Sequence, residues 1–161
     1  MDRLVEVEPL DPRLDGLDRF LDQLHLGFHG AGAIGPAALA EKIDQQKARA
    51  LANEVYAVSG DGAFGRDFGL RNQARRAAVS VMANIAEGFE RGGDSEFRQF
   101  LAVAKGSCGE VRSHLYAAVD QGYLTPEQHR QVAEQAEEIG RMMAGLMRHL
   151  RRSPLKGNKY K

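Results

Sequence analysis

Six polar side chains recur at steps of three and four residues along the middle of this chain. They comprise two amides, two guanidinium groups, a hydroxyl and a carboxylate: Gln73, Arg76, Ser80, Asn84, Glu87 and Arg91. At about 100° per residue this spacing places them on one face of a helix, where each can form directional hydrogen bonds. We call this face the polar stripe.

Two interpretations of the polar stripe are open. In one, the stripe is a solvated face whose charges pair within the helix at steps of three or four residues. In the other, it is a seam that contacts another helix or subunit. The second interpretation makes four members of the stripe candidate subunit-interface residues: Gln73, Ser80, Asn84 and Glu87.

Apolar residues at helical spacing must position these side chains. The helix that carries the polar stripe has an apolar face of Leu70, Ala74, Ala77, Ala78, Val81, Ile85 and Phe89. Two later segments continue the spacing, with Phe97, Leu101, Ala104, Cys108, Val111, Leu115 and Ala118, and then Val132, Ala136, Ile139, Met143, Leu146 and Leu150. This pattern is typical of antiparallel bundles, and no period-two strand pattern occurs. The predicted fold is an all-α, antiparallel up-down-up-down four-helix bundle with an N-terminal helical extension.

Helix boundaries are predicted from capping residues and glycines. The first bundle helix is expected to begin at Pro36 or a few residues later and to end at Val58. Three glycines are expected to form the connection to the next helix: Gly60, Gly62 and Gly65. Asp94 or Ser95 can cap the third helix, and Gly122 is expected to end it in a left-handed conformation. Residues 125–128 form a capping box for the fourth helix.

The chain is divided into three parts by this pattern. Residues 1–35 are an N-terminal extension, residues 36–152 the bundle, and residues 153–161 a basic tail. The extension contains leucines at helical spacing, Leu14, Leu17, Leu21 and Leu24. They predict a short amphipathic helix, followed by a glycine-rich hinge.

The central segment resembles a known family. Its resemblance is carried by Arg75-Arg76-Ala77-Ala78-Val79-Ser80 and Asn84-Ile85-Ala86-Glu87-Gly88-Phe89, with Glu54-Val55-Tyr56 upstream and Ala104-Lys105-Gly106-Ser107 downstream. These motifs are similar to those of the bacterial four-helix-bundle family encoded by intervening sequences in 23S ribosomal RNA genes. The resemblance covers about residues 43–152. The chain lacks the tryptophan usual near the start of the family's first helix.

The resemblance implies an assembly and a class of partner. The family is related to the accessory variability determinant of diversity-generating retroelements, a basic pentamer that partners a reverse transcriptase and its RNA. By this resemblance the chain is expected to form a ring-like homopentamer. It would offer RNA or DNA phosphates a set of basic side chains: Arg75, Arg76, Arg91, Arg148, Arg151, Arg152, Lys156, Lys159 and Lys161.

The charge distribution gives this expectation partial support. The net charge is zero, yet residues 141–161 contain seven bases and no acid. Cations near the end of a helix complement its dipole, whereas the three lysines beyond Pro154 suit contact with phosphates. A dedicated nucleic-acid binder is usually basic overall. The alternative is therefore a protein-interaction scaffold with no nucleic-acid role.

No motif indicates catalysis, a metal or a cofactor. Residues 30–35 match a dinucleotide-binding fingerprint, but no strand precedes them. His25 and His29 have the spacing of a metal pair, without a third ligand. Cys108 lies on the apolar seam of its helix, where a buried role is expected. We therefore expect a non-enzymatic protein.

The composition predicts a location as well. No apolar run approaches the roughly 20 residues that span a bilayer, and the first residues lack a secretory signal. A single cysteine suits a reducing compartment. The expected location is the cytoplasm.

Overall fold

The structure, a computed structural model, describes the backbone of residues 36–152 and the side chains of residues 45–152. The described residues form five helices and no strand: α2 (Pro36–Val58), α3 (Gly62–Arg66), α4 (Phe68–Glu90), α5 (Asp94–Asp120) and α6 (Pro126–Arg152). The predicted N-terminal helix, the hinge and the basic tail lie outside the described residues.

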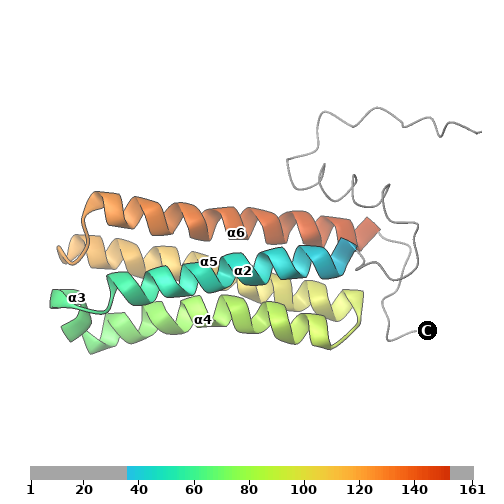
Figure 1. Ribbon diagram of the computed structural model, residues 1–161, viewed down its shortest axis with the longest axis horizontal. Coiled ribbons are helices and arrows are strands. Elements are labelled where there is room, and N and C mark those ends of the chain that lie inside the picture. The colour runs from blue at the N-terminus through green and yellow to red at the C-terminus, as the bar shows by residue number, and fades with distance from the viewer. Residues whose placement is uncertain (1–35, 153–161) are drawn as a thin grey trace, which may run out of the picture.

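The four long helices run up, down, up and down along one axis (Figure 1). Helix α4 packs between α2 and α5, and α6 packs between α5 and α2, so the four helices enclose one core. The short helix α3 lies at the end of the bundle where α2 gives way to α4. The predicted all-α bundle is confirmed.

The core consists of the predicted apolar residues. Every member of the seams predicted for α5 and α6 is buried, and Leu101, Leu115, Met143 and Leu146 are completely inaccessible. On α4 the middle of the apolar face is buried, while Leu70 and Phe89 are half-buried at its ends. Spacing alone therefore identified the face that each long helix turns inward.

One boundary prediction is incomplete and one is wrong. Gly60, Gly62 and Gly65 lie in the connection between α2 and α4 as predicted, but this connection also contains helix α3, which packs the buried side chain of Phe64 into the bundle end. The third long helix is capped by Gly93, and Asp94 is already its first residue. Gly93 has an extended backbone whose carbonyl accepts from the Phe97 amide, so no side-chain cap is used.

Two other boundary predictions are confirmed. Gly122 ends α5 with φ of 70°. Thr125 and Gln128 form the reciprocal capping box, with backbone amide to side-chain oxygen distances of 3.0 and 3.2 Å. Both signals are local in sequence, because each depends on residues within one helical turn.

Glycines inside the helices fall into two kinds. A Cβ at Gly88 of α4 would lie 2.5 Å from the Cβ of Phe100, so the close approach of α4 and α5 requires a glycine there. A Cβ at Gly106 or Gly109 of α5 would meet nothing within 4 Å. A glycine inside a helix costs roughly 0.5–1 kcal/mol relative to alanine, and no contact in this subunit explains that cost at the two α5 positions.

Candidate nucleic-acid interface

Arg75 fastens α4 to the end of α2. Its Nε donates to the Ser59 hydroxyl at 2.8 Å and its Nη2 to the Ser59 carbonyl at 2.9 Å. The guanidinium also lies over the Tyr56 ring, 4.5 Å from the centroid. The end of a helix carries unpaired carbonyls and a partial negative charge, which a guanidinium complements. Part of the hydrogen-bonding capacity of Arg75 is thus used within the subunit.

A second arginine pairs with an aromatic ring beside it. The Arg71 guanidinium lies 4.6 Å from the centroid of Phe68, and its Nη1 donates to the Gly65 carbonyl at 2.9 Å. Phe68 is 64% exposed and Tyr56 is 48% exposed. Two exposed aromatic rings, each stacked with an arginine, therefore lie near the α3 end of the bundle.

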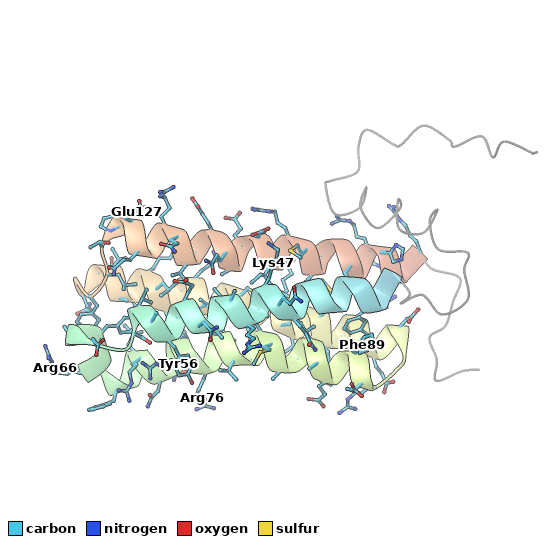
Figure 2. All side chains as sticks on the ribbon, in the orientation of Figure 1. Lys47, Tyr56, Arg66, Arg76, Phe89 and Glu127 are labelled. Atoms are coloured by element: carbon cyan, nitrogen blue, oxygen red, sulfur yellow. The ribbon has the colours of Figure 1, made fainter. Side chains whose placement is uncertain are left out.

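Two further arginines at this end carry free charge. Arg66 and Arg76 are exposed and form no hydrogen bond or ion pair with any described residue. Figure 2 shows Arg66, the last residue of α3, at the tip of the bundle and Arg76 further along α4, in the same half of the bundle as Tyr56. We call Arg66, Arg71, Arg75 and Arg76 the α3-end arginines. Within this group, Arg66 and Arg76 are the members whose guanidinium groups are open to phosphates.

The other predicted basic residues lie at the opposite end. Arg91 is stacked 4.8 Å from the Phe100 centroid and pairs with Glu87 at 2.6 Å. Fifteen residues of helix, about 22 Å, separate it from Arg76. The end of α6 lies at the same end of the bundle as Arg91 and adds Arg148, Arg151 and Arg152 (Figure 1). The predicted basic residues thus form two groups, and Lys156, Lys159 and Lys161 lie outside the described residues.

The polar stripe is divided between α5 and solvent. Ser80 Oγ lies 2.9 Å from Ser107 Oγ on α5, and the Asn84 amide donates to the Ser80 carbonyl and hydroxyl at 2.8 and 3.0 Å. Gln73 and Glu87 are exposed. Part of the stripe therefore joins two helices of one subunit. The helical spacing did not predict that Ser80 contacts Ser107, which is itself buried.

The described residues contain no constellation for metal chemistry. No group of three or more His, Cys, Asp or Glu side chains in this part of the chain could hold a metal ion. Cys108 is buried as expected. His25, His29 and residues 30–35 fall outside the described range. No helix in the described part is long and apolar enough to cross a bilayer.

Comparison with known proteins identifies the relatives of this bundle. The family described as 23S rRNA-intervening sequence protein matches residues 42–145. A crystal structure from Bacteroides thetaiotaomicron, of a protein of unknown function from the S23 ribosomal protein family, superposes with a TM-score of 0.62 at 20% identity. The superposition covers 68% of this chain and 98% of that one. No curated protein matches the chain.

Proposed function

Because the chain belongs to the family of 23S rRNA-intervening sequence proteins, we propose that it is a non-enzymatic accessory protein that binds RNA through phosphate contacts. The observation that carries this proposal is the group of α3-end arginines. Arg66 and Arg76 form no hydrogen bond with any described residue, and guanidinium forks match phosphate geometry.

The neighbouring aromatic rings favour RNA over a purely electrostatic ligand. Tyr56 and Phe68 are exposed beside the α3-end arginines. Unpaired bases stack on aromatic rings and on arginine planes. DNA phosphates would satisfy the same arginines, so the choice between RNA and DNA is an outcome of the binding test.

The oligomeric state belongs to the same proposal. We propose a homo-oligomer, specifically the pentamer that the family resemblance implies, in the cytoplasm. In an oligomer the α3-end arginines repeat in every subunit, so weak phosphate contacts would add through avidity. A reverse transcriptase is the protein partner that the resemblance suggests.

The alternative function is a protein-interaction scaffold. The zero net charge favours it, since nucleic-acid binders are usually basic overall. A scaffold of this kind would use the same exposed aromatic rings to contact a protein, without any dependence on phosphates.

A matched pair of variants separates the two functions. Arg66→Gln combined with Arg76→Gln removes the free charges near α3. Arg130→Gln combined with Arg141→Gln removes the same charge from α6, where Arg130 pairs with Glu127 at 2.7 Å and Arg141 with Glu137 at 3.0 Å.

The readout is the anisotropy of a labelled single-stranded RNA at low salt, with duplex DNA in parallel. We expect the first pair to weaken RNA binding about tenfold or more, and the control pair to change it by less than about twofold. Equal effects of the two pairs would contradict the assigned surface. If the unaltered protein binds neither RNA nor DNA, the nucleic-acid function is contradicted and the protein-interaction scaffold remains as the proposed function.

A further inference from the structure

The outer face of α5 carries apolar side chains that are largely exposed, although the Tyr116 ring also packs against His129 of α6, with the ring centroids 4.4 Å apart. Val103 is 54% exposed and Tyr116 is 57% exposed. Between them lie Gly106 and Gly109, where an added Cβ would meet nothing. The face is therefore apolar at its ends and flat at its centre, which lets another backbone approach closely.

The two edges of this face have opposite charge. On the edge toward α6, Arg98, Lys105 and Arg112 recur every seven residues. Lys105 shows that this edge faces α6, because a Cβ added at Gly140 of α6 would lie 4.0 Å from the Lys105 Cγ. On the edge toward α4, Glu110 follows Ser107 by three residues, and the Ser107 hydroxyl contacts Ser80 of α4. We call these the basic edge and the acidic edge of α5.

We propose that a second copy of this chain packs its α5 against this face, parallel to the first α5 and related to it by a rotation axis along the helices. In this arrangement the acidic edge of one copy meets the basic edge of the next. An antiparallel pair would place edges of like charge together. Opposite charges at the flanks of parallel helices select partner and orientation in the same way in coiled coils.

The heights of the charges fit this arrangement. Rotation about an axis parallel to α5 leaves every residue at its own height along the helix. Glu110 of one copy and Arg112 of the next copy then differ in height along the helix axis by two residues, or about 3 Å. The same contact repeats around a ring, so the surface suits a cyclic oligomer with heterologous contacts. This inference rests on the homo-oligomer proposed above and names its contact surface.

Charge exchange across the contact provides the sharpest test. Glu110→Arg alone and Arg112→Glu alone each create a pair of like charges, and the two together restore an opposite pair with reversed signs. The mass of the full chain is measured by light scattering over a dilution series. Each single variant should raise the protein concentration at which the oligomer dissociates about tenfold or more, and the double variant should restore it toward that of the unaltered protein.

A second pair of variants tests the glycine surface. Gly106→Leu should dissociate the oligomer by filling the flat centre of the face, while circular dichroism shows that the helices persist. Ala50→Leu adds the same side chain at an exposed position of α2 and should leave the mass unchanged.

The outcomes distinguish three cases. An oligomer that survives both Gly106→Leu and the single charge reversals overturns the α5 contact and leaves the oligomer itself in place. Failure of the double charge exchange to restore assembly overturns the parallel arrangement. A monomeric unaltered protein overturns the α5 contact and the proposed oligomer together, while RNA binding by that same sample tests the RNA role separately.

Discussion

The Arg75 guanidinium donates to both the hydroxyl and the carbonyl oxygen of Ser59, at 2.8 and 2.9 Å. The Ser59 hydroxyl in turn donates to the Val55 carbonyl at 2.6 Å. One arginine of α4 thereby holds the last turn of α2, although it was predicted from sequence as a phosphate ligand. Its neighbour Arg76 has no such partner within residues 36–152, so adjacent arginines have separable roles.

Arg75→Ala should therefore lower stability, whereas Arg76→Ala should not. Loss of the Arg75 contacts leaves the Ser59 carbonyl without its donor and should cost about 1–3 kcal/mol. Arg76→Ala should change the free energy of unfolding by less than about 0.5 kcal/mol. Urea unfolding of the two variants measures the difference, and equal stabilities would show that the Ser59 contact does not hold α2.

Leu101 and Leu115 lie on the seam of α5 and are completely buried. Replacing either with alanine should cost about 2–5 kcal/mol, through lost burial and a residual cavity. Thermal melts provide the measurement. An unchanged melting temperature for both variants would mean that the packing of α5 has been misassigned.

The polar stripe should separate into a folding part and an assembly part. Asn84→Ala removes two hydrogen bonds to Ser80 and should cost about 1–2 kcal/mol of stability. Glu87→Ala breaks an exposed pair with Arg91. The free energy of unfolding should therefore change by less than about 0.5 kcal/mol. If Glu87 lies in a subunit interface, as the sequence predicts, its replacement should weaken association in sedimentation. Unchanged melting temperatures and unchanged sedimentation for both variants would support the interpretation of the polar stripe as a solvated face.

Tyr123 should contribute stability that is lost at high pH. Its hydroxyl donates to Asp67 Oδ2 at 3.2 Å, and burial together with the Asp67 charge raises the pKa of this phenol above its ordinary value of 10.0. The contribution is complete below that value and disappears as the pH rises through the raised pKa. Unfolding of Tyr123→Phe and the unaltered protein should differ at pH 7 and converge in strong alkali; a constant difference would contradict this assignment.

Local patterns predicted most of the fold. The three-and-four spacing found the buried faces, and the capping box and Gly122 found two boundaries, because these signals lie within a few residues of one another. The Arg75–Ser59 and Tyr123–Asp67 contacts could not be predicted this way, since 16 and 56 residues separate their partners. The sequence placed Ser80 in the polar stripe as a candidate contact residue, but its partner Ser107 is 27 residues away along the chain. The helical period gives the direction of a side chain and not the identity of the residue that meets it.

The salt dependence of RNA binding tests the central claim most directly. Affinities of the full chain and of a chain ending at residue 152 are compared for single-stranded RNA across salt concentrations. If guanidinium and ammonium groups neutralise phosphates, the logarithm of the affinity falls linearly with the logarithm of salt, by about 0.7 per contact. Removal of Lys156, Lys159 and Lys161 should flatten that slope by up to about two units. An affinity that does not depend on salt, or no binding at low salt, would contradict the account.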